Sequence, residues 1–113
     1  MGKPSEILIA AKELISDPDR WTMKFLARNK VEREVDPTAP FACKWCAAGA
    51  VINIARKAGT DDELVLPFLR TATKEWGLHG KAGSPAILND RGVHMEVMKL
   101  FDKAIELALQ KGM

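Results

Sequence analysis

The segment 45–52 is apolar on nearly every side of a helix, and this feature constrains the fold more than any other. Such a helix has no face suited to water, so other elements must surround it. The breaker cluster 36–40 precedes the segment, and Gly59 follows it as a candidate left-handed C′ residue. We therefore predict a helix from about Phe41 to Ala58 with Thr38 as its N-cap, and a mostly α fold packed around it.

Small residues fill one stretch of this helix, namely Ala47, Ala48, Gly49 and Ala50. Glycine inside a helix costs up to about 1 kcal/mol relative to alanine. A close crossing by a neighbouring helix or loop is the usual compensation. We expect a tryptophan to lie over this surface, and the candidates are Trp21, Trp45 and Trp76.

Three further helices are predicted from apolar stripes and end signals. The first covers about residues 6–15. The next begins with the capping box Thr60-Asp61-Asp62-Glu63 and should break just before Pro67. The last runs from about Val93 to Gln110, with its apolar face formed by Val93, Val97, Leu100, Phe101, Ala104 and Ala108.

The remaining segments predict a small irregular part within a single domain. Between Trp21 and Val35 the helical period is lost, which indicates a small β-hairpin or irregular extension near residues 21–35. The connection 78–92 is long for its lack of structure and invites a functional role. With 113 residues, the chain is expected to form one compact domain of about four helices, covering residues 1–113.

Charge and apolar runs exclude several classes of protein. Seventeen Lys and Arg are interspersed with fifteen Asp and Glu, so a polyanionic partner is not expected. No apolar run approaches the length of a membrane helix, since Lys12, Asn53 and Arg56 interrupt the longest ones. Two cysteines without a secretion signal are typical of a cytoplasmic protein.

Cys43 and Cys46 lie three positions apart and would share one face of the predicted helix. A redox pair would need the first cysteine at a helix N-terminus, whereas Cys43 follows the first predicted turn. A zinc site would need two more ligands, and His79 and His94 lack the spacing of a zinc finger. Without such partners, the two cysteines are small apolar residues of the helix.

A thiol enzyme is the second chemistry that the residue types allow. Cys46, then His79 or His94, then the amide of Asn89 would supply nucleophile, base and orienting group. Asp90 with His94 could form an acid/base pair. We nevertheless expect the Asn89-Asp90 pair to cap the first turn of the final helix or to form an Asx turn.

Several short motifs occur in order along the chain: Trp21-Thr22, Leu26-Ala27-Arg28, Trp45-Cys46-Ala47-x-Gly49-Ala50, Asn89-Asp90, Glu96-Val97 and Asp102-x-Ala104-Ile105. Together they resemble a family of small bacterial and phage proteins known only as a domain of unknown function. The resemblance covers about Leu8 to Ala108. It implies a shared fold and no known activity, and Cys43, Leu88 and His94 depart from the family pattern.

We therefore expect a non-enzymatic protein-interaction or regulatory module, acting as a homo-oligomer or on a protein partner, without a cofactor or metal. Its surface would be an exposed apolar patch near residues 77–92 or along the terminal helix. The alternative is a cysteine- or zinc-dependent enzyme centred on Cys46 with His79 or His94. The second alternative is a weak nucleic-acid binder that uses the basic run 24–33, although acidic residues follow that run closely.

Overall fold

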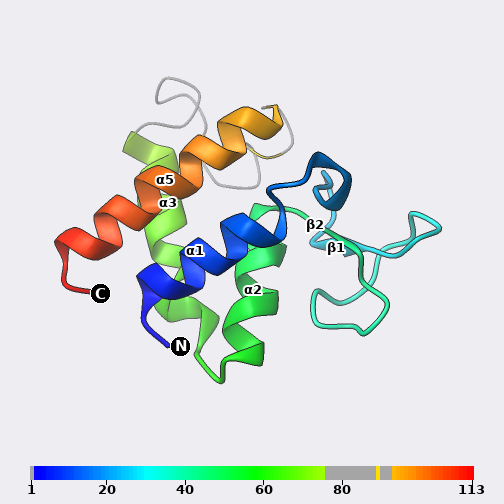
Figure 1. Cartoon of the computed structure of the whole chain (residues 1–113), viewed down its shortest axis with the longest axis horizontal. Helices are drawn as coiled ribbons and strands as arrows, with labels where there is room; N and C mark the ends of the chain where they lie inside the picture. Colours follow the sequence, from blue (N-terminus) through cyan, green and yellow to red (C-terminus); the bar gives the residue numbers. More distant parts are fainter. Residues whose placement is uncertain (1, 76–88, 90–92) are drawn as a thin grey trace.

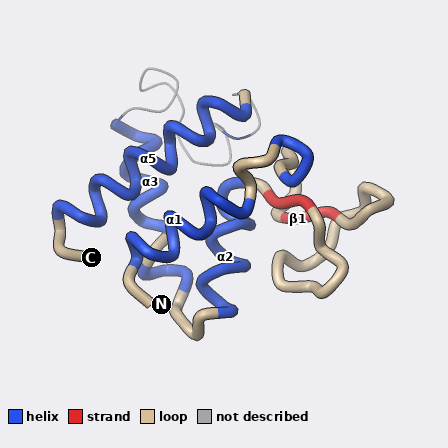
Figure 2. Tube along the Cα trace, viewed as in Figure 1, coloured by secondary structure: helices blue, strands red, loops and turns tan. Residues whose placement is uncertain are grey.

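Four α-helices and one small sheet make up the part of the chain that the computed structural model describes, which is residues 2–75, 89 and 93–113. The helices are α1 (Pro4–Leu14), α2 (Ala47–Lys57), α3 (Leu66–Glu75) and α5 (His94–Gln110), with two 3₁₀ turns, η1 (Pro18–Arg20) and η2 (Asp62–Leu64). The strands β1 (Ala27–Arg28) and β2 (Lys44–Trp45) pair antiparallel (Figures 1 and 2). The predicted fold class, mostly α with a small hairpin, is confirmed.

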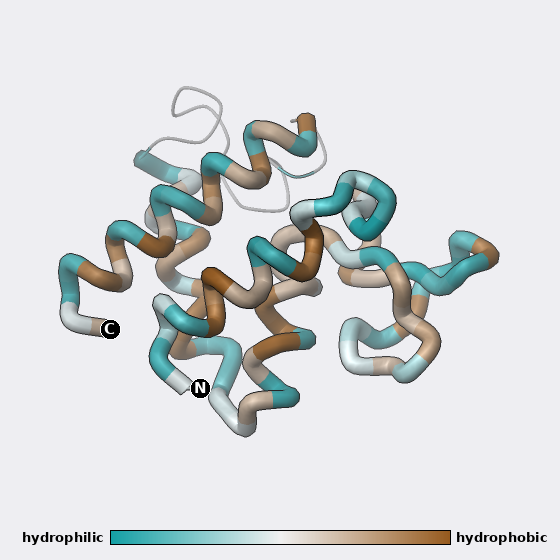
Figure 3. Tube along the Cα trace, viewed as in Figure 1, coloured by the Kyte–Doolittle hydropathy of each residue, from teal (hydrophilic) through white to brown (hydrophobic). Residues whose placement is uncertain are grey.

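Apolar and polar residues alternate along each helix (Figure 3). The core lies between the apolar faces of the helices. α1 packs against α2 and α5, and α3 packs against α5. Five of the six residues predicted for the apolar face of the last helix are fully buried: Val97, Leu100, Phe101, Ala104 and Ala108. Val93 is 62% exposed because it is the N-cap and lies outside the helix. Contrary to the prediction, α2 is not the centre of the packing, since it lies mainly along α1.

α2 begins at Ala47, so the prediction of a helix from Phe41 was wrong. The preceding residues are extended because their backbone groups pair with the segment 26–28. The Cys43 N–H donates to the Arg28 carbonyl at 2.9 Å, and the Cys46 N–H donates to the Leu26 carbonyl at 3.2 Å. Thr38 does not cap the helix, because its N–H and hydroxyl both donate to the Asp36 carboxylate.

Gly49 permits a close crossing, as the small residues predicted, and the atoms nearest to it belong to the Leu26 backbone and not to Trp21 or Trp45, while Trp76 lies outside the described residues. A Cβ placed on Gly49 would lie 1.9 Å from the Leu26 carbonyl oxygen, far inside contact distance. That carbonyl also accepts the Cys46 N–H. Glycine at position 49 therefore allows the segment before β1 to reach the first turn of α2.

The turn between α2 and α3 follows the predicted plan except for its cap. Gly59 has φ +72°, as expected of a left-handed C′ residue. The predicted capping box is wrong, because Asp61 and not Thr60 accepts a backbone N–H, from Glu63. The Glu63 carboxylate instead pairs with Arg70 at 3.0 Å. The expected break before Pro67 is confirmed, since η2 ends at Leu64 and Pro67 lies in the first turn of α3.

Residues 21–45, called the extension below, stand beside the helices and include the predicted hairpin (Figure 1). Arg28 and Glu34 form an antiparallel bridge, and the Asn29 N–H donates to the Arg33 carbonyl across the tip. Glu32 in this tip has φ +64°. β1 also pairs with β2, a segment that the sequence assigned to a helix.

A membrane-spanning length is not reached by any helix in the described part of the chain.

Candidate functional site

Cys46 is the N-cap residue of α2, with its sulfur facing the first turn of the helix. Its Sγ accepts the Gly49 N–H at 3.3 Å, and the residue is 8% exposed. A sulfur in this place interacts favourably with the exposed backbone N–H groups of a helix start. Cys46 therefore has a local structural role, which the sequence missed because the helix was predicted to begin earlier.

Asn89 joins three segments through hydrogen bonds of its buried side chain. Its Oδ1 accepts both the Trp21 Nε1–H at 2.7 Å and the Ala47 N–H at 3.0 Å. Its Nδ2 donates to the Thr22 carbonyl at 3.0 Å. Asn89 thus caps α2 and not the final helix, contrary to the prediction, since α5 begins after Val93 without a side-chain cap. The predicted Asx turn would involve residues outside the described part of the chain. Its neighbour Asp90 lies outside the described residues.

The prediction that Cys43 and Cys46 share one helical face is wrong, because the backbone between them is extended. Three extended residues separate two Cα atoms by roughly 10 Å, beyond the roughly 7 Å that a disulfide allows. Strand alternation also directs the two side chains to opposite faces. Cys46 points toward α2, whereas Cys43 is half-buried and lines a surface hollow.

His94, the candidate base, contacts backbone and an aromatic ring. Its Nε2 lies 2.7 Å from the Ile15 carbonyl oxygen, and its ring meets Trp21 edge-on with 5.6 Å between centroids. His79, the other candidate, falls outside the described residues. Within residues 2–75, 89 and 93–113, no three His, Cys, Asp or Glu side chains gather as a metal site would require.

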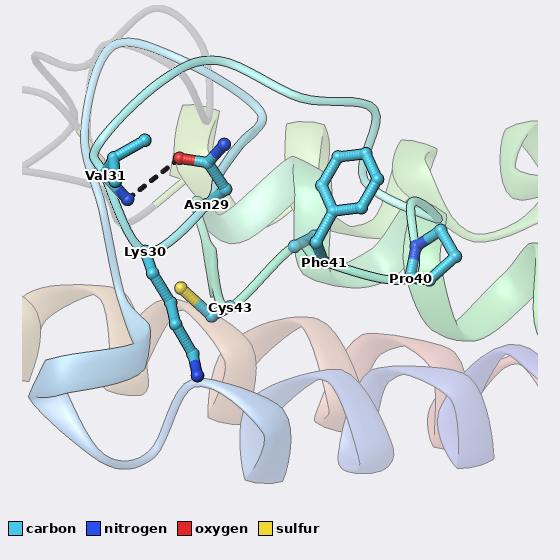
Figure 4. Close-up of a pocket in the computed structure, with 7 residues that line it drawn as sticks. Asn29, Lys30, Val31, Pro40, Phe41 and Cys43 are labelled. Carbon is cyan, nitrogen blue, oxygen red and sulfur yellow. Dashed lines mark hydrogen bonds between the residues drawn. The ribbon is translucent and has the colours of Figure 1, made fainter.

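The hollow beside Cys43, called the extension groove below, has a volume of about 470 Å³. Its lining residues come from the hairpin tip and from the loop before β2: Asn29, Lys30, Val31, Pro40, Phe41, Ala42 and Cys43. Figure 4 shows Asn29 and Val31 on one wall, Phe41 and Pro40 on the other, and the Cys43 sulfur between them. Val31 is 69% and Phe41 63% exposed.

The hairpin that carries one wall is held by polar contacts beneath its tip. The Lys44 ammonium lies 2.6 Å from the Glu32 carboxylate, and this hydrogen bond lowers the pKa of Glu32 and raises the pKa of Lys44. Arg28 donates to the Glu32 and Met23 carbonyls. Its guanidinium also lies 4.6 Å from the centre of the Phe25 ring, a cation–π contact. These partners of Arg28 all lie within the extension, so its side chain stabilises the fold of the extension.

The loop that carries the other wall is held to α2 by one carbonyl group. The Pro37 oxygen accepts the Trp45 Nε1–H at 2.9 Å and the Asn53 Nδ2–H at 2.7 Å. Asn53 is 2% exposed, which explains why a polar residue interrupts the apolar stretch of α2. The loop wall is thus fixed to α2, and the hairpin wall is fixed to Lys44 in β2, the strand that leads into α2.

Val31 and Phe41 were missed as site residues, although the sequence contains a weak signal for each. Val31 is a lone apolar residue in the charged run 28–34, and Phe41 follows a proline in a breaker cluster. The apolar patch predicted along the terminal helix is reduced to the separate exposed side chains of Met95 and Leu109. The other predicted location, residues 77–92, lies outside the described part except for Asn89.

A search of curated proteins and a search of solved structures found no match to the chain. One family model matches residues 1–107, and its description is "Family of unknown function (DUF6197)". The match includes the whole extension, α2 with Cys46 and Gly49, and most of α5. It agrees with the resemblance inferred from the Trp-Cys-Ala-x-Gly-Ala and Asn-Asp motifs, and the chain therefore belongs to this family of unknown function.

Proposed function

We propose that the protein is a non-enzymatic interaction module of the bacterial or phage-host cytoplasm, and that the extension groove binds a protein segment. One observation carries the proposal: Val31 and Phe41, 69% and 63% exposed, lie on opposite walls of one hollow. Isolated exposed apolar residues are ordinary, but apolar walls that face each other across a hollow are typical of recognition sites.

The fixed backbone of the groove supports the same function. Both walls are held by hydrogen bonds that do not involve Val31 or Phe41, because the Glu32–Lys44 pair supports one and the Pro37 carbonyl the other. A preorganised groove loses little conformational entropy when a ligand binds. The exposed side chains are consequently available for binding and are not needed for the local fold.

Photocrosslinking followed by affinity measurement tests this function. A photoreactive benzoylphenylalanine at position 41 should capture a protein in cells, whereas the same group at Met95, which is 64% exposed on α5, should not. The captured protein is then purified and titrated against wild type, Val31→Asp and Met95→Asp. We expect Val31→Asp to weaken binding roughly tenfold or more and Met95→Asp to leave it unchanged. Equal binding by Val31→Asp would exclude the groove.

Thiol chemistry at Cys46 is the second candidate, favoured by the Gly49 N–H that its sulfur accepts at 3.3 Å. A helix N-terminus stabilises a thiolate, with His94 or His79 and Asp90 as candidate partners. Alkylation of the Cys43→Ser variant across pH tests it. Rapid reaction of Cys46 below neutral pH would support this chemistry, whereas an inert thiol would leave Cys46 as a cap. Native mass spectrometry of the wild-type protein tests zinc binding by Cys43, Cys46, His79 and His94.

A further inference from the structure

The chemistry of the extension groove selects its occupant. Among the described residues, its polar lining includes Lys30 and the Asn29 amide and no Asp or Glu. Asn29 Oδ1 already accepts the Val31 and Arg33 N–H groups, which leaves Nδ2 as a donor. Within the described chain Lys30 forms no ion pair, and its side chain extends past Cys43, away from Phe41 (Figure 4). The complementary ligand has an apolar side chain next to carboxylates.

The chain itself contains such a segment. Residues 61–64 read Asp-Asp-Glu-Leu and form the turn η2. Leu64 is 55% exposed although it lies beside apolar residues of α3. Of the three carboxylates, Glu63 is neutralised by Arg70, whereas Asp62 has no ion pair among the described residues. The segment therefore presents one exposed leucine next to the carboxylates of Asp61 and Asp62, which form no ion pair among the described residues, while Asp62 also interacts electrostatically with Arg70.

We propose that the extension groove binds the 61–64 segment of a second copy of this chain, with Leu64 between Val31 and Phe41 and Asp62 near Lys30. This inference rests on the groove being a binding site, as proposed above. Within one copy the two surfaces cannot meet, because the connection between α2 and α3 lies well apart from the extension (Figure 1). The contact is therefore head to tail between copies. In an open assembly one end copy keeps an unused groove and the other an unused segment, and only closure of a ring fills both.

A second hollow supports this pairing. It has a volume of about 310 Å³, adjoins Leu64, and is lined partly by Pro67, Phe68 and Met113. Because this hollow adjoins Leu64, a copy that receives Leu64 in its extension groove also lies close to the apolar lining of the hollow. Both partners then cover apolar surface that a single copy leaves in water.

A mixing experiment tests the inference, because the two halves of a head-to-tail contact can be disabled separately. Wild type should increase in mass with concentration in analytical ultracentrifugation. Val31→Asp and Leu64→Asp, both at exposed positions, should each be monomeric. An equimolar mixture of the two should form a dimer and nothing larger, since only one intact groove and one intact segment remain. Leu109→Asp, at a 60% exposed site on α5, is the matched control and should associate like wild type.

Charge reversal identifies the ion pair within the same contact. Lys30→Glu and Asp62→Lys should each weaken association, and their equimolar mixture should associate again like wild type, because each groove then meets a segment of opposite charge on the other variant. A wild type that remains monomeric up to about 1 mM overturns the inference. So does association that survives both Val31→Asp and Leu64→Asp. If position 41 then still crosslinks a different protein, only the self-association fails; if it crosslinks none, the proposed function fails as well.

Discussion

Among the described glycines, Gly49 is the one at which an added Cβ would clash with another backbone. Its absent Cβ leaves room for the Leu26 carbonyl, which would otherwise lie 1.9 Å from it. Two backbones cannot separate here without breaking the hydrogen bond from the Cys46 N–H to the same carbonyl. The steric demand and the hydrogen bond thus act on one atom.

Gly49→Ala is expected to lower the free energy of unfolding by about 3 kcal/mol, despite the higher helix propensity of alanine. Urea denaturation followed by circular dichroism measures the loss. Gly59→Ala is the control: it has φ +72° but open space around it, so only backbone strain of about 1 kcal/mol is expected. Equal losses in the two variants would show that the close approach at Leu26 is not a constraint.

Asn89 is the second residue with effects beyond its size. Asn89→Ala removes the acceptor of two buried donors, Trp21 Nε1–H and the Ala47 N–H, and should cost about 3 kcal/mol of stability. Asn53→Ala is the matched comparison, since the Pro37 carbonyl keeps its bond from Trp45, and about 1.5 kcal/mol is expected. Thermal or urea unfolding of both variants gives the two values, and a smaller loss for Asn89→Ala would contradict the assignment.

At the scale of elements, the hairpin tip depends on the Glu32–Lys44 pair and is therefore sensitive to pH. The hydrogen bond from Lys44 lowers the pKa of folded Glu32 below its ordinary value of 4.5. A lowered folded pKa means that the stabilisation is complete above pH 4.5 and is lost as the pH falls through the folded pKa. The hairpin tip should thus loosen locally in acid.

Amide hydrogen exchange at pH 7 and below pH 4.5 measures this loosening. Wild type should lose protection at the Asn29 N–H, which bonds across the tip, as the pH falls. Glu32→Gln should have the lower protection already at pH 7 and should change less with pH. In a Lys44→Met background, Glu32→Gln should have no further effect, because the partner is absent. A wild type whose exchange follows only the intrinsic chemistry of the amide would refute the role of this pair.

The elements that followed from the sequence are those with a complete local pattern. The stripe of α5, the break before Pro67 and the left-handed Gly59 all depend on residues within a few positions of each other. The start of α2 does not, because residues 41–46, which are small or apolar except for Lys44, suit a helix or a strand equally. Hydrogen bonds to residues 26–28, distant in sequence, decide between the two.

The groove could not be predicted for a related reason. Val31 and Phe41 are single apolar residues with no periodic partners, so neither the helical nor the strand pattern of apolar residues includes them. Their proximity arises only when the hairpin tip is bonded to β2 and the loop before β2 is bonded to α2. The spacing of Cys43 and Cys46, in contrast, suggested a redox or zinc pair, although the extended backbone directs the two side chains to different surroundings.

At the scale of the whole molecule, the extension and the helices share hydrogen bonds and should unfold together. In a Trp76→Phe background the remaining tryptophans, Trp21 and Trp45, both report on the extension, whereas far-ultraviolet circular dichroism reports on the helices. The two urea transitions should coincide, as for a single domain. Phe101→Ala, in the fully buried core, should shift both by the same amount, about 4 kcal/mol. Separate midpoints would indicate two independent units.

The hydrogen bonds of Asn89 also bear on the order in which the molecule folds. Its partners Ala47, Thr22 and Trp21 lie 42, 67 and 68 residues earlier in the chain. Closing such long loops costs entropy before any bond compensates for it, so these contacts form after the local turns of α1 and α2. An Asn89 variant should therefore unfold faster while refolding at the wild-type rate. The hydrogen bonds of Asn89 should thus set the unfolding rate, and with it the lifetime of the native state, without changing the folding rate.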